Sequence, residues 1–172
     1  TPPAAVSVFD PDFHEGVVGI VASRIKDKLH RPTFVFAASG APGKEHELKG
    51  SGRSIPGFHL RDALDLVSKR HPGLLLRFGG HAMAAGCTIE EARFDEFERA
   101  LAQVAQEWLD AATLTRRMET DGPLSPQWLN TTLIEQMQLA VWGQGFAAPT
   151  FSEEMEITSQ RLVGEKHLKL EL

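Results

Sequence analysis

Short apolar runs alternate with segments of helical periodicity along the first part of the chain, and this alternation constrains the fold most. A strand-like run at residues 5–9 precedes a helical pattern over residues 17–29, which Arg31-Pro32 ends. A second strand-like run covers residues 33–37. Strands interleaved with helices are typical of an α/β fold. We therefore expect a mainly open, mixed sheet flanked by helices.

The alternation continues beyond a turn rich in Gly and Pro. An extended pattern at residues 47–54 is weakened by its glycines, which mark a close backbone approach. A short helical pattern at residues 60–67 and a strand-like run at 83–89 follow. A long amphipathic helix is then predicted over residues 90–111, from apolar side chains three and four positions apart.

The composition changes around residues 113–126, where a dibasic pair precedes Asp121-Gly122-Pro123. We place a boundary there, which gives one domain over residues 1–112 and a second over residues 113–172. Because the sequence lacks an initiator Met and stops within a strongly apolar strand pattern, we expect an excised piece of a larger protein with an incomplete second domain.

The second domain is expected to hold one amphipathic helix followed by strand-like segments. Residues 128–141 have helical periodicity, and the pattern breaks at Gly143-Gln144-Gly145. Residues 155–160 and 161–172 have strand-like patterns.

The charge is unevenly distributed along a chain whose net charge is −5. Residues 42–81 carry seven Lys or Arg against four acids, whereas residues 82–112 carry two Arg against seven acids. A cationic centre of this kind can bind a few phosphates without binding every polyanion. An ordinary mixed-charge surface is the alternative.

A membrane location and a disulfide are both disfavoured. No apolar run approaches the length of a membrane span, and the first residues do not resemble a signal peptide. Cys87 is the single cysteine, so no intrachain disulfide can form, which favours the reducing cytoplasm. Its apolar surroundings argue against a nucleophilic role.

The segment Gly79-Gly80-His81-Ala82-Met83-Ala84-Ala85-Gly86 surrounds one imidazole with small residues. Backbone N–H groups in such a segment can approach a bound anion closely, which favours a ligand-facing loop. The alternative is a tight turn before a buried strand at residues 84–89, with His81 merely satisfied by hydrogen bonds.

Three segments, at residues 13–16, 50–54 and 79–86, are expected to form one phosphate-binding pocket near the ends of the predicted elements. Arginine offers a forked set of donors, serines add hydroxyl groups, and a histidine before a helix adds a donor near the helix's positive end. The alternatives are a helix cap at His14 and Glu15 and a twisted edge strand at 51–53. The candidate residues are His14, Ser51, Gly52, Arg53, Ser54, Gly79, Gly80 and His81.

No metal ligands are predicted in this chain. The seven histidines form no His-x-x-x-His pair, and Asp10-Pro11-Asp12 is better explained as a turn than as a metal site with His14. The sequence also lacks the glycine-rich nucleotide loops and the nucleophile elbow of known enzyme families.

The same segments carry a resemblance to a known family. The motifs at residues 14–24 (HEGVVGIVASR), 49–54 (KGSGRS) and 79–86 (GGHAMAAG) resemble the DHH-associated domain of RecJ-type single-strand-specific DNA exonucleases. Residues 141–146 (VWGQGF) and 162–170 (LVGEKHLKL) resemble the start of the oligonucleotide-binding (OB-fold) barrel that follows in those enzymes.

The resemblance implies part of a 5′-to-3′ exonuclease of DNA repair and recombination. A separate DHH domain would hold Mn²⁺ or Mg²⁺, and this chain would bind single-stranded DNA, with Ser51, Arg53 and His81 at the phosphate and His81 as the catalytic residue. The resemblance also implies cooperation with single-strand-binding protein and a helicase. The chain alone is expected to be inactive.

Two other functions remain open from the sequence. The same domain could belong to a DHH-family phosphodiesterase that acts on short oligonucleotides or signalling nucleotides, although a partial barrel after residue 113 fits a long strand better. A non-catalytic phosphate-binding or protein-interaction module is the third interpretation.

Overall fold

The computed structural model describes residues 2–143 and 146–172. The chain divides into two compact units, Thr1–Arg116 and Arg117–Leu172. The sequence analysis placed this division between residues 112 and 113.

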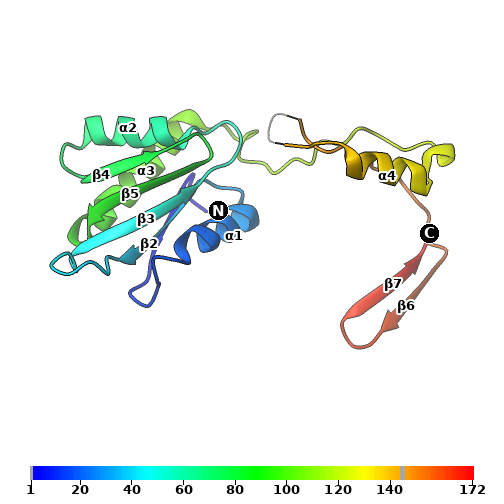
Figure 1. Ribbon diagram of the computed structural model, residues 1–172, viewed down its shortest axis with the longest axis horizontal. Helices are drawn as coiled ribbons and strands as arrows, with labels where there is room; N and C mark the ends of the chain where they lie inside the picture. Colours follow the sequence, from blue (N-terminus) through cyan, green and yellow to red (C-terminus); the bar gives the residue numbers. More distant parts are fainter. Residues whose placement is uncertain (1, 144–145) are drawn as a thin grey trace. The chain divides into compact units, whose positions relative to one another are not determined.

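The first unit is built on one five-stranded sheet with the order β1-β2-β3-β5-β4 (Figure 1). The two strands at one edge are parallel, and every other neighbouring pair is antiparallel. The strands are β1 (Val6–Phe9), β2 (Thr33–Ala38), β3 (Glu47–Arg53), β4 (Arg77–Gly80) and β5 (Ala84–Glu90). The predicted mixed, open sheet is therefore confirmed.

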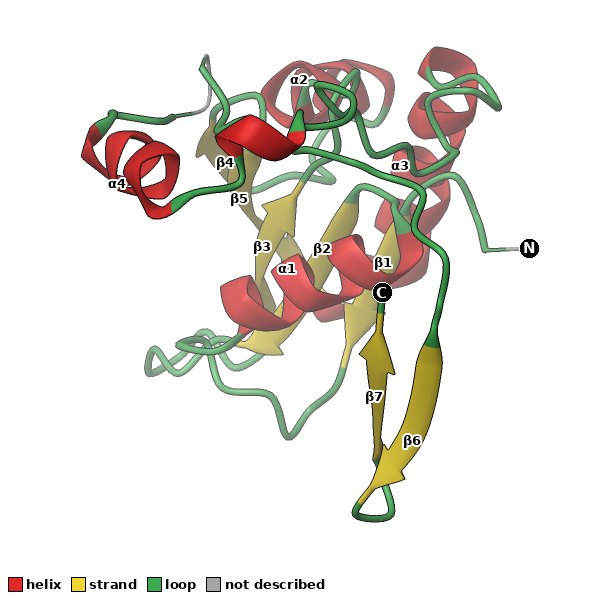
Figure 2. Ribbon diagram, turned by 90° about the vertical axis from the view of Figure 1, so that its right-hand side faces the viewer, coloured by secondary structure: helices red, strands yellow, loops and turns green. Residues whose placement is uncertain are grey.

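Helices cover both faces of the sheet but cover them unequally. The crossover helix α1 (Val18–Leu29) packs on one face against β2 and β3 (Figure 2). The helices α2 (Leu60–Arg70) and α3 (Phe94–Trp108) pack on the other face, where most of the core lies. The predicted helix at 90–111 begins later than expected, because Glu91–Arg93 forms a 3₁₀ turn before α3.

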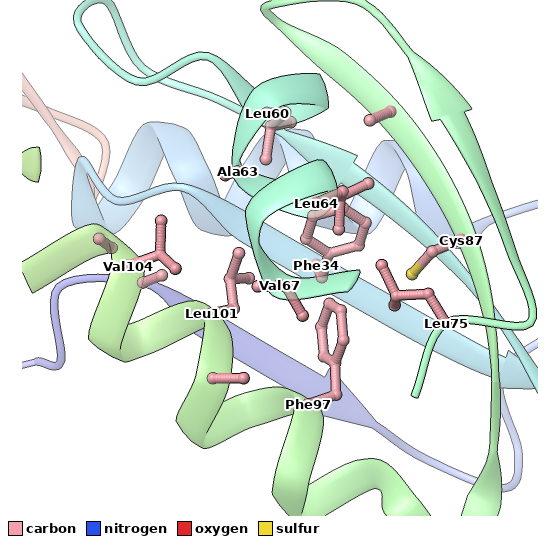
Figure 3. Close-up of a cluster of buried hydrophobic side chains, with 14 of the residues drawn as sticks. Phe34, Leu60, Ala63, Leu64, Val67, Leu75, Cys87, Phe97, Leu101 and Val104 are labelled. Atoms are coloured by element: carbon pink, nitrogen blue, oxygen red, sulfur yellow. The ribbon is translucent and has the colours of Figure 1, made fainter. Parts of the chain in front are cut away.

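The alternation of β2 residues builds the two sides of the core. Phe34 points toward α3, where the ring of Phe97 meets it edge-on at 5.4 Å between centroids (Figure 3). Phe36 also meets Phe97 edge-on, at 5.1 Å between centroids. Val35 and Ala37 point the other way, into the cluster under α1. Period-two alternation along a strand that is buried on both faces produces this division.

The second unit holds one helix and one hairpin. Its elements are a 3₁₀ turn at Pro126–Trp128, α4 (Thr131–Leu139), β6 (Ser159–Val163) and β7 (His167–Glu171). The part of this unit that the structure describes contains no closed barrel, in keeping with an incomplete OB domain.

Several predicted bounds differ from the structure. Residues 161–172 form two strands rather than one, because Gly164 turns the chain at φ 63°. The segment 155–160 becomes a strand only at its end, and α4 is shorter than the predicted helix over 128–141. Of the predicted break at 143–145, Gln144 and Gly145 lie outside the described residues. None of the helices in the described ranges combines the length and the apolar character needed to cross a bilayer.

The segment Gly79–Gly86 is a hairpin rather than a loop. Its first two glycines end β4 and its last three residues begin β5, which the sequence analysis did not separate. Gly80 has φ 138°, a conformation that favours glycine. The hairpin has features of both interpretations of this segment. It is a tight turn before a strand, and its turn is exposed as a ligand-facing loop would be.

Candidate functional site

The polar side chains of β3 lie on the face of the sheet that α1 packs on. Ser51 pairs with Val35, which belongs to the cluster under α1. A Cβ atom at Gly19 of α1 would lie 3.2 Å from the Ser51 hydroxyl and 2.9 Å from a guanidinium nitrogen of Arg53. The helix therefore approaches these two side chains closely because position 19 has no side chain.

Three rows of residues cross β3, β5 and β4 on this face, because residues paired in register lie side by side. Successive rows are two residues, or about 7 Å, apart along the strand. We call the three rows together the open face. They are the arginine row (Arg53, Ala84), the glycine row (Ser51, Gly86, Gly79) and the lysine row (Lys49, Thr88, Arg77).

The middle of the open face carries almost no side-chain bulk. A Cβ atom added at Gly79 would have no neighbour within 4 Å, and one at Gly86 would meet only a carbonyl oxygen at 3.5 Å. The helix α1 covers β2 and β3 rather than β4. A flat ligand group can therefore lie directly on the backbone there.

Arg53 is held in place but keeps donors free. Its Nη1 donates to the Ser51 hydroxyl at 3.1 Å and to the Gly52 carbonyl oxygen at 2.8 Å. Among residues 2–143 and 146–172, no carboxylate forms a salt bridge with this guanidinium. A partly buried guanidinium without an acid partner is suited to bind an anion through its remaining N–H groups.

His81 lies beside the arginine row, at the turn between β4 and β5. Its backbone N–H donates to the carbonyl oxygen of Ala84, the residue that pairs with Arg53. Its side chain is exposed and makes no hydrogen bond in the described part of the chain, so the interpretation of His81 as a hydrogen-bonded core histidine is wrong. The turn is anchored, since Ser54 N–H donates to the Met83 carbonyl oxygen at 3.0 Å.

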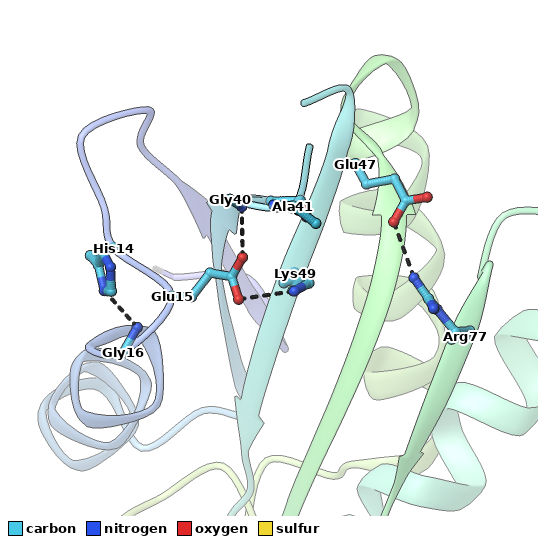
Figure 4. Close-up of polar contacts among 9 residues, drawn as sticks. His14, Glu15, Gly16, Gly40, Ala41, Glu47, Lys49 and Arg77 are labelled. Carbon is cyan, nitrogen blue, oxygen red and sulfur yellow. Dashed lines mark hydrogen bonds and ion pairs between the residues drawn. The ribbon is translucent and has the colours of Figure 1, made fainter. Parts of the chain in front are cut away.

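His14 and Glu15 form hydrogen bonds that hold the segment before α1 (Figure 4). The Gly16 N–H donates to His14 Nδ1 at 3.0 Å. The Glu15 carboxylate accepts from Gly40 N–H at 2.8 Å and from Lys49 Nζ at 3.0 Å. These two hydrogen bonds, the Gly40 one first, lower the pKa of Glu15 below its usual value. The N-cap of α1 is Val17, which has no side-chain cap, so the His14 ring bonds within the turn before the helix and does not cap it.

Two candidate residues face the core. Ser54 is 1% exposed, and its hydroxyl donates to the Phe58 carbonyl oxygen at 2.5 Å, so it is not placed to meet a phosphate. A Cβ atom at Gly52 would lie 2.4 Å from the ring of Phe34. This glycine is required by an aromatic ring on the α3 side of the sheet, and not by a ligand.

The sequence analysis missed Gly19 and treated Lys49 and Arg77 only as part of a cationic stretch. One signal for Gly19 was available, because a glycine inside a helical pattern costs about 1 kcal/mol relative to alanine and so indicates a close approach. Another signal was the period-two alternation of polar residues at Lys49, Ser51 and Arg53.

The described residues offer neither a metal site nor a reactive thiol. No group of three or more His, Cys, Asp or Glu is placed to hold a metal ion within the described ranges. Cys87 is buried on the core side of β5, and burial raises the pKa of its thiol far above the usual value.

The fold and the open face define the class of protein, an α/β domain in which a helix covers only part of one cationic sheet face, next to a glycine-histidine hairpin. The DHHA1 domain model matches residues 1–107, and the RecJ OB domain model matches residues 120–172. The chain belongs to the DHHA1 domain family.

Relatives named single-stranded-DNA-specific exonuclease RecJ match nearly the whole chain. The protein from Dickeya dadantii is 49% identical and that from Escherichia coli 45% identical, each over 99% of this chain. The chain spans 29% of the length of each of these relatives. The crystal structure of RecJ in complex with Mg²⁺ from Thermus thermophilus has a TM-score of 0.77 at 32% identity, and the match covers 99% of this chain and 25% of that chain. A second structure of that protein, with Mn²⁺, has a TM-score of 0.75.

These findings confirm the resemblance inferred from the three motifs. The chain corresponds to the DHHA1 and OB portion of RecJ and does not include the catalytic DHH domain.

Proposed function

We propose that this chain is the nucleic-acid-binding part of a 5′-to-3′ exonuclease specific for single-stranded DNA, acting in DNA repair and recombination. Its open face holds the substrate phosphate against a metal site that a DHH domain supplies. The single observation that carries this proposal is the Arg53 guanidinium, which is positioned by Ser51 and Gly52 and has no carboxylate partner among the described residues.

The arginine and glycine rows provide complementary contacts for a phosphate. Arg53 offers charged N–H donors, the Ser51 hydroxyl lies beside them, and the backbone of the exposed residue His81 bonds to Ala84, which pairs with Arg53. The bare backbone at Gly79 lets a sugar or base lie close to the sheet. Contacts of this kind recognise the backbone of a strand without reading its sequence.

The role of this chain is positioning. Hydrolysis at a metal site requires the substrate strand to be held accurately, and a guanidinium that binds one of its phosphates on the opposite wall does so without contacting the metal. The described residues do not form a metal-binding group, so we assign the ions to the DHH domain. Mn²⁺ and Mg²⁺ are the ions in the Thermus thermophilus RecJ structures, and we infer the same ions for the whole protein.

A long strand is the favoured substrate. The RecJ OB domain match over residues 120–172 supports a long single strand over a signalling dinucleotide. Cooperation with single-strand-binding protein and a helicase stays a prediction from the resemblance, as does a cytoplasmic location.

A binding titration tests the proposal. We expect the 172-residue chain to bind a 3′-fluorescein-labelled, 5′-phosphorylated single strand more tightly than the 5′-hydroxyl strand or a duplex, measured by fluorescence anisotropy at low salt. Arg53→Gln should weaken binding by about 1–3 kcal/mol, the range for a charge-assisted hydrogen bond.

Arg61→Gln is the matched control, because Arg61 lies over the Phe78 ring at 4.6 Å on the α2 side of the sheet. It removes one positive charge from the opposite face and should leave the affinity unchanged. Equal affinity of the wild type and Arg53→Gln would refute the proposed site.

A further inference from the structure

A hollow of about 390 Å³ adjoins the glycine row on the side away from Arg53. Five of the residues that line it are Lys49, Arg77, Gly79, Gly86 and Thr88. Lys49 and Arg77 both pair in register with Thr88, from β3 on one side and β4 on the other. The lysine row therefore places one cationic residue on each side of Thr88, next to the glycines that also line the hollow.

Each cation forms an ion pair with one carboxylate, Lys49 with Glu15 and Arg77 with Glu47 (Figure 4). Lys49 Nζ lies 3.0 Å from Glu15, and Arg77 Nη2 lies 3.2 Å from Glu47. An ammonium has three N–H donors and a guanidinium five, so one contact each leaves most of them available. A side chain that is already oriented loses less conformational entropy when it binds a ligand.

Thr88 contributes a hydroxyl group between the two cations. The residue is 8% exposed, and its hydroxyl makes no hydrogen bond within the part of the chain that the structure describes. The hydroxyl oxygen is not among the buried side-chain atoms without a partner there, so it is open to solvent. Thr88 lines the hollow, so a bound acceptor there would satisfy it.

The strand register determines how far the lysine row lies from Arg53 and where this cationic surface ends. The lysine row lies four residues along β3 from Arg53, about 13 Å at the backbone, and the side chain of Arg53 reaches back to Ser51 and shortens this separation. The next row along β3 and β5 pairs Glu47 with Glu90, which repels a further phosphate.

We propose that Lys49, Thr88 and Arg77 form a second phosphate site, which takes the phosphodiester group that follows the phosphate at Arg53 along the same DNA strand. This inference rests on the proposed function and specifies its ligand. The open face is then built for at least a dinucleotide unit, with the sugar and base between the phosphates lying on the glycine row.

The test compares two ligands with one and two phosphates. Thymidine 5′-monophosphate and 5′-phosphorylated thymidine dinucleotide compete with the labelled single strand for the 172-residue chain, and inhibition constants are read by anisotropy. The double variant Lys49→Gln/Arg77→Gln should weaken dinucleotide binding roughly tenfold, the effect of losing one charge-assisted contact, and leave monophosphate binding within about twofold.

A second double variant, which leaves the net charge unchanged, distinguishes the loss of a phosphate contact from the effect of an unpaired carboxylate. Lys49→Gln leaves Glu15 unpaired, whereas Glu15→Gln/Lys49→Gln removes both members of the pair. We expect the two variants to bind the dinucleotide equally weakly. If the second change restores wild-type binding, the unpaired carboxylate caused the loss and Lys49 is not a phosphate ligand.

The outcomes distinguish the two proposals. If Lys49→Gln/Arg77→Gln retains the wild-type ratio of dinucleotide to monophosphate affinity, the second site is refuted, while a loss of monophosphate binding in Arg53→Gln still supports the proposed function. If Arg53→Gln binds the monophosphate normally, the proposed function fails whatever the ratio. Arg61→Gln should change neither constant, and thermal melting of each variant checks that it folds.

Discussion

At the scale of single residues, the glycines around the open face are required for different physical reasons. Gly52 faces the ring of Phe34, Gly80 turns the hairpin at φ 138°, and Gly79 faces open space. The sequence analysis grouped all three as residues that admit a phosphate. It could not separate them, because the face on which each glycine lies depends on strand register and on aromatic rings far away in the chain.

Gly52→Ala should therefore lower the stability of the fold, whereas Gly79→Ala should weaken binding of the strand. An added methyl group at position 52 would lie 2.4 Å from the Phe34 ring, so we expect the free energy of unfolding to fall by about 1–3 kcal/mol, the usual cost of overpacking. At position 79 the methyl group meets no atom within 4 Å, so stability should change little while binding of the labelled strand weakens. Urea denaturation and anisotropy measure the two effects.

Each of these substitutions also has a clear contrary result. If Gly52→Ala unfolds at the wild-type urea concentration, the Phe34 ring can move aside and the core does not explain this glycine. If Gly79→Ala binds the strand normally, the glycine row is not in contact with the ligand.

The two serines in the same segment illustrate what strand alternation can and cannot predict. Ser51 lies on the open face with Lys49 and Arg53, as period two requires. Ser54 follows the end of β3, where the alternation no longer applies, and its hydroxyl donates to the carbonyl oxygen of Phe58. This hydrogen bond joins a side chain to a backbone carbonyl four residues further along the chain. The pattern of apolar residues does not predict such a bond.

At the scale of elements, α1 approaches β3 closely beside the Arg53 guanidinium, which Ser51 and Gly52 hold in place. Gly19 lies in the first turn of α1, and the helix contacts the sheet through Val18 and Ala22. The sequence predicted this helix and its apolar face. It did not predict which residues of another strand the helix would cross.

Gly19→Ala should separate stability from binding. Alanine is favoured over glycine in a helix by up to about 1 kcal/mol, so the free energy of unfolding should stay the same or rise. The new methyl group would lie 2.9 Å from Arg53 Nη2, so the guanidinium must move away from Ser51 and binding of the 5′-phosphorylated strand should weaken. Thermal melting and anisotropy on the same sample provide both values. A lower melting temperature with unchanged affinity would mean that α1, and not Arg53, shifts.

The strand β4 was not predicted because its local signals are weak. It is four residues long, and two of the four are glycines, which are poor strand formers. Pairing with β5 in an antiparallel hairpin stabilises it, and that pairing places Arg77 beside Thr88. Strand pairing rather than the propensity of single residues therefore builds the lysine row.

At the scale of the whole molecule, the first unit extends beyond the predicted boundary because contacts distant in sequence hold its last residues. The Arg31 Nη1 donates to the Leu114 carbonyl oxygen at 2.8 Å, and His30 Nε2 lies 3.1 Å from the Thr113 carbonyl oxygen. In each pair the two residues are 83 positions apart in the chain. A change in composition marks where such a boundary can fall, but side-chain contacts decide where it does.

The net charge of −5 is compatible with binding a polyanion because three cationic side chains gather on one face of the sheet. The acidic helix α3 packs on the core side, whereas Lys49, Arg53 and Arg77 lie on the open face. A local cationic surface attracts a strand even when the whole molecule is acidic.

The isolated chain should bind a single strand without degrading it. The residues that the structure describes form no group of three metal ligands, and hydrolysis assisted by two metal ions needs such groups. We therefore expect a 5′-phosphorylated, 3′-labelled strand to stay intact on a denaturing gel after incubation with the 172-residue chain and Mn²⁺, under conditions where anisotropy shows that it is bound. Arg53→Gln serves as the control for contamination, because a copurifying nuclease would degrade the strand equally in both preparations. Degradation by the wild type that disappears in Arg53→Gln would show that this chain supplies catalytic groups of its own.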